Sequence, residues 1–301
     1  MYHYLLCGLK VESDLAFPEL TPWEGVDDRA FDIEFRLGHV EPLQTADAAG
    51  EKFQVQGKNR LVFLIEGVGR VLIEDGKRIV FNAWPDSDPQ RVRLNFIGTV
   101  QSILWHQRGY IPLHASAVKV GERAIAVGGP TRGGKSAIAA ALTARGCPLV
   151  ADDFTVVDWA QKPPLVLPGY QKLRLWKDAA VELDVLDAVV AKAHPAMDKY
   201  VVAPAKTFSG EAPALTDLFL LAGERGEELH IERLRAVPSF QNLLAAVHMP
   251  DEARALGLQS QIFSSLNAIV SSVNIWQVTA PDDLRRVRDV ADAVLRRVAE
   301  A

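Results

Sequence analysis

The fold of this chain is decided by Ala124-Ile125-Ala126-Val127-Gly128-Gly129-Pro130-Thr131-Arg132-Gly133-Gly134-Lys135-Ser136. Its apolar first part is typical of a buried strand, and the run from Ala137 to Arg145 that follows it favours a helix. A strand, then the pattern G-x-x-x-x-G-K-[ST], then a helix is the order of a phosphate-binding loop. The stretch therefore predicts such a loop within an α/β domain.

The residue types of this loop suit the binding of an anion. Glycines let backbone N–H groups turn toward one anion, and the following helix adds its positive N-terminal end. We expect Lys135 to reach the β and γ phosphates of ATP, and Ser136 to place its hydroxyl on Mg²⁺. A glycine-rich turn that caps a helix without binding phosphate is the alternative. The expected nucleotide contacts are Gly129, Pro130, Thr131, Arg132, Gly133, Gly134, Lys135, Ser136 and Ala137.

Two adjacent carboxylates follow the next predicted strand. The run from Cys147 to Ala151 leads into Asp152 and Asp153, and one short helix separates it from the loop. A right-handed crossover would make the two strands parallel, so the loop and both carboxylates would share one edge of the sheet. Successive strand residues face opposite ways, so we expect one Asp to hold Mg²⁺ and the other to accept a hydroxyl proton. Alternatively, one Asp caps the next turn and only the other touches the metal.

A histidine is expected beside the loop. The strands from His114 to Val120 and from Ala124 to Gly128 flank a Gly121-Glu122 turn, which is a hairpin signal. Pairing Val120 with Arg123 places His114 opposite Gly129. There, His114 could tune a carboxylate or touch a phosphate. A structural histidine bonded to the loop backbone is the equal alternative.

Phosphoryl transfer gathers negative charge, so further cations should reach the site. Arg174 lies between Leu173 and Leu175, whose burial would turn its side chain the other way, and Lys199 precedes an apolar run. Both residues are candidates, with a solvated surface charge as the alternative. Arg132 is expected to point outward or toward a partner, and His248 to be a core or capping histidine.

The remaining sequence indicates two domains. A chain of 301 residues exceeds the usual single-domain length. From Tyr2 to about Trp84, short apolar or alternating runs predict strands, and Trp84-Pro85-Asp86-Ser87-Asp88-Pro89 favours a turn. We therefore expect a smaller β-rich domain over residues 1–88, for acceptor recognition or homo-oligomer assembly, and a P-loop kinase domain over residues 89–301.

Several classes of protein are disfavoured by composition. The formal net charge of −5 offers no general attraction to nucleic acid or to anionic membranes. Cys7 and Cys147 do not form a disulfide framework, and the N-terminus lacks a basic region and an uninterrupted apolar core. No uncharged apolar run approaches the length of a membrane span. These features predict a reduced, cytoplasmic protein.

The order His114-Ala115-Ser116, the loop from Gly129 to Ser136, and Val150-Ala151-Asp152-Asp153 resembles the HPr kinase/phosphorylase family. This resemblance implies that Asp152 acts as general base toward a serine hydroxyl with His114 assisting. It also implies that Asp153 and Ser136 help to hold Mg²⁺.

The whole chain looks still more like the HPr kinase-like proteins of ribosomal-peptide pathways, including kinases of lasso-peptide precursors. Their β-rich N-terminal region and Pro-Gly-x-x-x-Leu-[KR]-Leu-Trp stretch correspond here to the first domain and to Pro168–Trp176. The Glu-x-Arg-Gly-Leu-Gly stretch of genuine HPr kinases is replaced by Val166-Leu167-Pro168-Gly169-Tyr170. HPr as acceptor, phosphorylase activity and the metal-binding role of that family's glutamate are therefore not carried over.

The leading hypothesis is transfer of the ATP γ-phosphate to a serine hydroxyl of a peptide or small protein, such as a ribosomal peptide precursor. Two alternatives remain open. One is a P-loop kinase of a small-molecule hydroxyl, and the other is a nucleotide-dependent regulatory or binding module with slow hydrolysis.

Overall fold

A computed structural model describes residues 1–25, 30–43, 52–57, 59–193 and 197–300. The chain forms two compact units of mixed α/β structure. The first contains Met1–Tyr110 and Met249–Ile262, and the second contains Ile111–His248 and Phe263–Ala301. The first division thus falls between Tyr110 and Ile111, later than the expected boundary between residues 88 and 89, and a later segment returns to the first unit.

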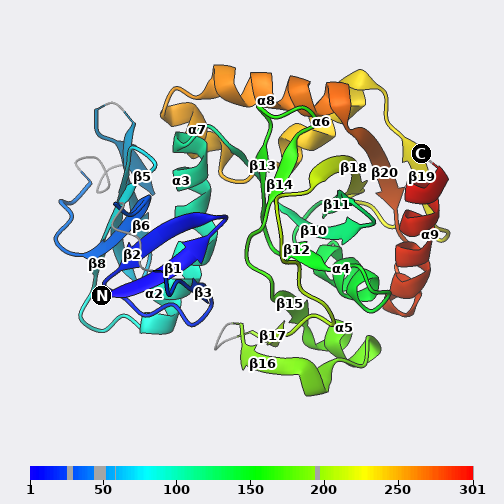
Figure 1. The fold of residues 1–301 in the computed structure, drawn as a ribbon, viewed down its shortest axis with the longest axis horizontal. Coiled ribbons are helices and arrows are strands. Elements are labelled where there is room, and N and C mark those ends of the chain that lie inside the picture. Colours follow the sequence, from blue (N-terminus) through cyan, green and yellow to red (C-terminus); the bar gives the residue numbers. More distant parts are fainter. Residues whose placement is uncertain (26–29, 44–51, 58, 194–196, 301) are drawn as a thin grey trace. The chain divides into compact units, whose positions relative to one another are not determined.

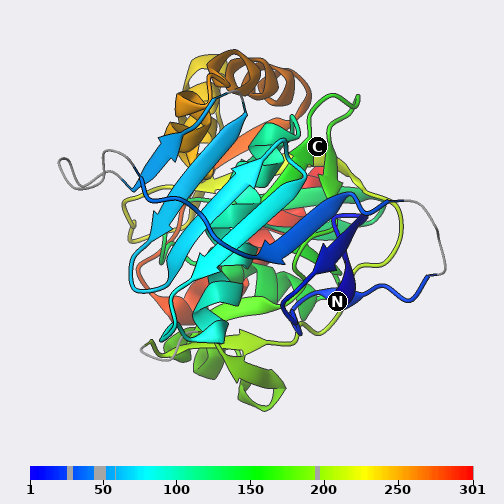
Figure 2. The ribbon, with the colours of Figure 1, turned by 90° about the vertical axis from the view of Figure 1, so that its left-hand side faces the viewer.

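The first unit is built on a β-sheet, as its alternating sequence predicts. Its strand order is β3-β1-β2-β4-β8-β7-β6-β5 (Figure 2). The strands are β1 (Tyr2–Leu6), β2 (Leu9–Ser13), β3 (Thr21–Pro22), β4 (Ile33–Leu37), β5 (Phe53–Val55), β6 (Arg60–Ile65), β7 (Gly69–Glu74) and β8 (Arg78–Ala83).

A helical segment follows this sheet and explains the shifted boundary. It consists of α2 (Pro89–Asn95), a π-helical turn (Phe96–Val100) and α3 (Gln101–Gln107). Asp88 caps its start by accepting a hydrogen bond from the Gln90 amide at 2.9 Å, and Gly109, with φ of 89°, follows its end. The ring of Phe96 lies 4.5 Å from that of Phe17 and 5.2 Å from that of Phe35. The helix therefore shares the core of the first unit.

The second unit contains a nine-stranded sheet and a separate three-stranded sheet (Figure 1). The large sheet has the order β12-β10-β11-β18-β14-β13-β9, with β20 pairing with β18 and β19 with β20. The small sheet has the order β15-β17-β16. The strands are β9 (Ile111–Leu113), β10 (Ala115–Val120), β11 (Arg123–Gly128), β12 (Leu149–Ala151), β13 (Thr155–Asp158), β14 (Leu165–Leu167), β15 (Leu173–Trp176), β16 (Val189–Lys192), β17 (Lys199–Val202), β18 (Ala214–Leu221), β19 (His230–Arg233) and β20 (Asn274–Thr279).

Strand directions bring four connections to one edge of the large sheet. Strand β10 pairs antiparallel with both β11 and β12, while β18 is parallel to β11 and β20 is parallel to β18. The carboxyl ends of β11, β12, β18 and β20 therefore point the same way. The expected hairpin register is confirmed, since Val120 pairs with Arg123 and Ser116 with Val127.

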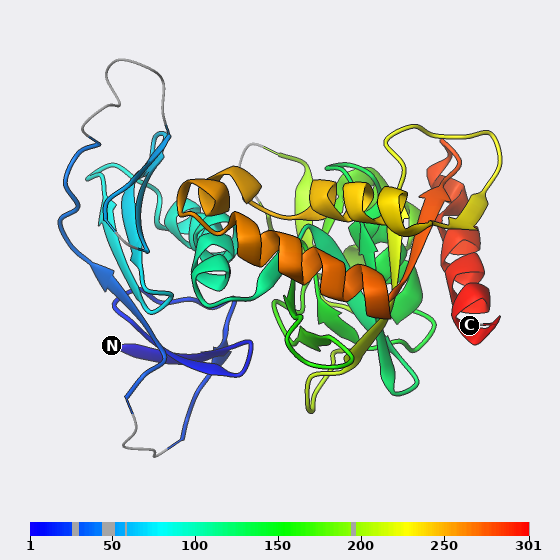
Figure 3. The same ribbon diagram turned by 90° about the horizontal axis from the view of Figure 1, so that it is seen from above.

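Helices cover both faces of this sheet (Figures 1 and 3). Helices α4 and α9 contribute their apolar sides to the main core, whereas α6 and α8 run side by side, with the Phe240 and Phe263 rings 5.4 Å apart. The helices are α4 (Lys135–Thr143), α5 (Lys177–Glu182), α6 (Ala236–Ala246), α8 (Gln259–Ser272) and α9 (Val287–Glu300), with 3-10 turns at Leu186–Ala188 and Leu284–Arg286. Helix α7 (Pro250–Ala255) belongs to the first unit.

Two segments of the second unit pair where the chain passes between the units. The His114 amide donates to the Ala246 carbonyl at 2.7 Å, and the His248 amide donates to the Pro112 carbonyl at 2.9 Å. Leu113 and Val247 form an antiparallel bridge between these contacts. The two histidines thus lie on neighbouring segments, each next to a residue of this bridge.

Among the helices of the described residues, none has the length and apolar character needed to cross a membrane.

Candidate functional site

The glycine loop, residues 129–134, connects β11 to α4 at the carboxyl edge of the large sheet. Gly129 has φ of 143°, and a Cβ there would lie 2.8 Å from the Leu221 Cβ. Gly134, with φ of 97°, directly precedes α4. Both positions require glycine, because an L side chain would be strained at either and would also meet β18 at the first.

Lys135 is the first residue of α4 and lies against the loop. Its Nζ donates to the carbonyls of Gly129 and Pro130, each at 2.9 Å, and the residue is 6% exposed. Burial lowers the pKa of Lys135 to about 8, although the charges of Asp153 and Asp152 oppose that change. The ammonium group is thus held at the loop by neutral carbonyls, which an anionic ligand could replace as partners.

Arg225 supports the loop from the connection after β18. Its Nη2 donates to the Gly133 carbonyl at 2.9 Å and to the Arg132 carbonyl at 3.5 Å. Sequence reasoning did not select this residue, which lies in an exposed turn far along the chain. Its position shortly after β18, a strand parallel to β11, could have indicated that Arg225 lies at the same edge of the sheet as the glycine loop.

Asp152 is completely buried and its oxygens have partners. Its Oδ1 accepts from the Ser116 hydroxyl at 2.6 Å, and its Oδ2 accepts from the Arg174 amide at 2.8 Å. Burial, followed by the charge of Asp153, raises the pKa of Asp152, and hydrogen bonds from Ser116, Arg174 and Ser136 only partly offset that rise. Through these hydrogen bonds, Asp152 links the end of β12 to β10, to β15 and to the first turn of α4.

Asp153 has a different setting from its neighbour. It has φ of 70°, so the chain has already left the extended strand conformation and the two carboxylates need not face opposite ways. Its Oδ2 accepts from Arg174 Nη1 at 2.6 Å. Burial would raise the pKa of Asp153, but the positive charges of Arg174 and Lys199 outweigh burial and hold that pKa below its ordinary value.

Arg174 has hydrogen-bonding capacity left over. Its side chain is only 10% exposed, and its Nε and Nη2 atoms are buried and find no hydrogen-bond acceptor within the described residues. Buried donors of this kind are costly to leave unpaired. Because Arg174 lines a cavity, these donors suit an anionic ligand.

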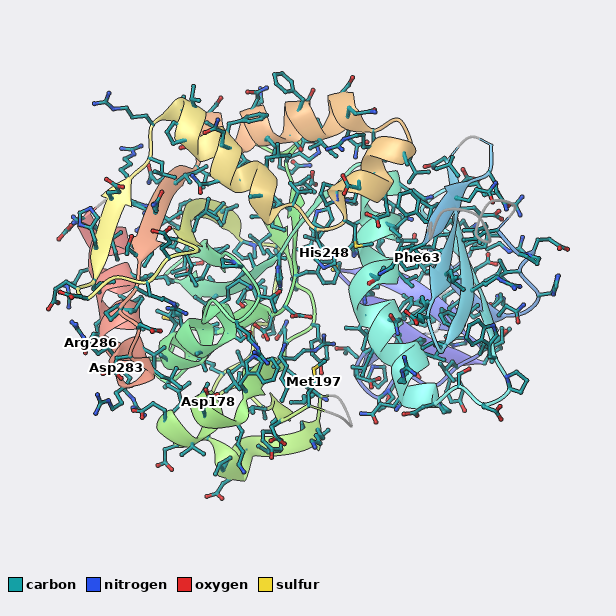
Figure 4. The ribbon with its side chains drawn as sticks, turned by 180° about the vertical axis from the view of Figure 1, so that it is seen from behind. Phe63, Asp178, Met197, His248, Asp283 and Arg286 are labelled. Carbon is teal, nitrogen blue, oxygen red and sulfur yellow. The ribbon has the colours of Figure 1, made fainter. Side chains whose placement is uncertain are left out.

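His114 and His248 lie together, with their rings 5.8 Å apart and nearly perpendicular. Burial, and then the charge of Lys135, lowers the pKa of His114 to about 4. Burial also lowers the pKa of His248, against the opposing charge of Asp153. His248 was expected to be a core or capping residue, yet it lies beside His114 and near the charges of Asp153 and Lys135. Figure 4 labels its side chain. Its pairing with β9 could not be inferred from local sequence.

One cavity of about 200 Å³ brings most of these groups together. Its lining includes His114, Thr131, Arg132, Gly134, Lys135, Ser136, Ala137, Asp153, Arg174, Trp176, Lys199 and Arg225. Four of the residues expected at the site are not in this lining, namely Gly129, Pro130, Gly133 and Asp152.

The aromatic ring of Trp176 lies near two cationic side chains. The Arg132 guanidinium carbon lies 4.4 Å from the ring centroid and Lys199 Nζ lies 5.9 Å from it. Arg132, which was expected to point outward or toward a partner, therefore contacts the residue that ends β15. Lys199 pairs with Trp176 across β15 and β17, which places its charge at the cavity.

Within the residues that the structure describes, no group of three or more His, Cys, Asp or Glu side chains could hold a metal ion. The Ser136 hydroxyl does hydrogen-bond to the Asp152 carboxylate. A hydroxyl beside one carboxylate fits Mg²⁺, which takes few protein ligands when phosphates supply the others.

No protein-family model matches the sequence, and no curated protein matches it. Among solved structures, the chain is similar to the Hpr(Ser) kinase/phosphatase from Coxiella burnetii, with 14% sequence identity and a TM-score of 0.31. The match covers 62% of this chain and 90% of that chain.

Proposed function

We propose that this protein is an ATP-dependent kinase that transfers the γ-phosphate to a hydroxyl group of a peptide or small protein. One observation carries the proposal: a single cavity is lined by Lys135 and Ser136 from the start of α4 and by Asp153 and Arg174 from the neighbouring strand ends. A cradle for phosphate and a carboxylate able to orient a hydroxyl are the two parts that such a reaction needs.

The glycine loop would hold the triphosphate. Its backbone N–H groups and the N-terminus of α4 provide a positive environment, and Lys135 adds a full charge. Lys135 would exchange its loop carbonyl partners for phosphate oxygens. Arg225 would hold the loop in place through the carbonyls of Gly133 and Arg132.

Arg174 and Lys199 would stabilise the phosphoryl group during transfer. The transition state spreads negative charge over the oxygens of the moving group, and fixed cations in a buried site are effective there. Arg174 is already oriented by Asp153, and its unpaired Nε and Nη2 atoms would donate to those oxygens. Because these donors are preorganised, little rearrangement is needed.

We assign the two aspartates in the opposite way to the family resemblance. Asp153 lines the cavity and would accept the proton of the acceptor hydroxyl. Asp152 is fully buried, and both of its oxygens are engaged, so it would orient Ser136 instead. The low pKa of Asp153 suits a reaction in which positioning of the hydroxyl matters more than base strength.

The Ser136 hydroxyl, which Asp152 orients, would hold Mg²⁺ at the cavity. When bound with ATP, the ion would neutralise charge on the β and γ phosphates. Neutral His114 would accept or donate one hydrogen bond at the cavity wall, and its neighbour His248 would restrict the orientation of its ring.

The proposal is tested by incubating the full chain with Mg²⁺, ATP labelled on the γ-phosphate, and peptides encoded by neighbouring genes. Label on a peptide serine is the expected result. Label on a metabolite would instead favour a small-molecule kinase, and slow release of phosphate alone would favour a regulatory module. Lys135→Ala should reduce transfer by roughly 10²- to 10³-fold. Lys119→Ala, which removes the Lys119–Glu122 ion pair at the β10–β11 turn, serves as the matched control.

A further inference from the structure

The cavity of the proposed phosphate site is rich in cations. Among the residues that the structure describes, five cationic side chains line it, namely Arg132, Lys135, Arg174, Lys199 and Arg225. Three of them are held by hydrogen bonds to oxygen atoms: Lys135 and Arg225 to loop carbonyls, and Arg174 to Asp153. Like charges in one cavity repel one another. Arg132 and Lys199 therefore need a partner that keeps them there.

The ring of Trp176 provides that partner. The Arg132 guanidinium carbon lies 4.4 Å from the ring centroid, and Lys199 Nζ lies 5.9 Å from it. The face of an indole ring attracts a cation although the ring carries no net charge. A carboxylate would attract the two cations as well, but its negative charge would offset theirs and repel a phosphate. Trp176 thus leaves the positive charge of the cavity undiminished.

Strand register explains why Trp176 meets Lys199. Trp176 ends β15 and pairs with Lys199, the first residue of β17. Residues directly opposite each other share one face of a sheet, and so do residues two apart on a strand, which adds Arg174. Leu175, between Arg174 and Trp176, turns the other way and is buried in the core. The small sheet therefore presents Arg174, Trp176 and Lys199 to the cavity.

Arg132 reaches the same ring from the glycine loop. Its backbone has φ of 63°, and its carbonyl accepts from Arg225 Nη2 at 3.5 Å. The residue is exposed, so without the ring its guanidinium could turn into solvent. Arg132 and Trp176 also line a wider groove of about 770 Å³ beside α5. Their contact therefore lies where this groove meets the phosphate cavity.

We propose that Trp176 is a positioning residue, whose ring holds Arg132 and Lys199 at the cavity for the negative charges of a triphosphate. The inference rests on the proposed kinase function and deepens it, because it makes the arginine side chain of the glycine loop a phosphate-binding group. When Mg·ATP binds, both cations would turn toward phosphate oxygens, which form stronger, charge-assisted hydrogen bonds with them. The surroundings of the indole would change, and its fluorescence would report that change.

The test measures Mg·ATP affinity by calorimetry on the full chain and on variants of Trp176. Trp176→Leu should weaken binding by roughly three- to tenfold, the scale of one or two lost cation–π contacts. Trp176→Phe keeps an aromatic face and should lose only about two- to threefold. Arg297→Ala is the matched control, because it removes a contact of the same kind, with Trp276 at 6.0 Å, outside this cavity. The control should retain wild-type affinity.

A second background distinguishes positioning from a merely structural role. In a chain that already carries Arg132→Ala and Lys199→Ala, Trp176→Leu should cause no further loss of affinity, because the groups it positions are gone. A structural role would give the same loss in both backgrounds. The fluorescence difference between wild type and Trp176→Phe should change when Mg·ATP is added.

The outcomes separate this role from the kinase proposal. Wild-type affinity in Trp176→Leu, or an undiminished loss in the second background, would overturn the positioning role and leave the phosphate site standing. Failure of wild type to bind Mg·ATP would overturn both. If melting curves show that Trp176→Leu does not fold, Trp176→Phe decides in its place: the two- to threefold loss should be seen with the two cations present and should vanish without them.

Discussion

Buried aspartates occur in two regions of the large sheet, and their surroundings differ. In the first half of β18, Asp217 Oδ1 accepts from Asn274 Nδ2 at 3.1 Å and from Trp276 Nε1 at 3.0 Å. Beyond the end of β12, buried Asp152 is followed by half-buried Asp153, which meets the guanidinium of Arg174 and lines a cavity. Burial is common to both regions, so it does not identify a site. Cations, unpaired donors and access to a ligand distinguish the second region.

The largest effect is expected when Asp153 and its neighbour Asp152 are replaced separately. Asp153→Asn should lower the transfer rate by roughly 10²- to 10⁴-fold, because the group that accepts the hydroxyl proton is lost, while Mg·ATP binding is retained. Asp152→Asn should chiefly weaken the Mg²⁺-dependent part of nucleotide binding. Single-turnover kinetics and calorimetry with and without Mg²⁺ would measure both effects. The reverse pattern would restore the assignment implied by the family resemblance.

The second-largest effect on turnover is expected for Lys135, whose ammonium group lies at the glycine loop. Lys135→Ala should reduce turnover by roughly 10²- to 10³-fold, since a charge directed at the phosphates is removed. Steady-state rates and nucleotide titrations would measure the loss. Wild-type turnover in this variant would remove the glycine loop from the mechanism.

The dependence of Mg·ATP affinity on pH tests the role of Lys135 in a second way. The pKa of Lys135 is lowered to about 8, so Lys135 loses its charge in the free protein as the pH rises through that value. Mg·ATP affinity should then fall by up to about tenfold per pH unit above pH 8, because binding must restore the proton. Lys135→Arg should remove this dependence, since arginine stays charged. An affinity that is flat from pH 7 to 10 in wild type would contradict the assignment.

The smallest effect is expected at the other aspartate. Asp217→Ala removes the acceptor of Asn274 and Trp276 and should lower the free energy of unfolding by about 1–3 kcal/mol. Nucleotide affinity should not change. Denaturant unfolding and calorimetry on one preparation would measure both quantities, and a large loss of ATP binding in a folded variant would show that the two regions are coupled.

Local patterns predicted much of this molecule. The Gly121-Glu122 turn determined the register of β10 and β11, and glycine and lysine spacing located the connection between β11 and α4. The early β-rich segment was also predicted correctly.

The remaining features depend on contacts between distant segments. The packing of Phe96 against Phe17 moves the unit boundary, and Arg225 reaches the glycine loop from another strand. Strand alternation could not show which aspartate faces the cavity, because the left-handed conformation of Asp153 ends that alternation. His248 reaches the site only through pairing with the segment that carries His114.

The most direct measurement is a crystal structure of the full chain with Mg²⁺ and a non-hydrolysable ATP analogue. The γ-phosphate should lie within hydrogen-bond distance of Lys135 Nζ and of the Arg174 donors Nε or Nη2, with Asp153 beside it. A nucleotide bound away from the glycine loop, or one whose γ-phosphate lies on the β20 side of that loop, would contradict the proposed site.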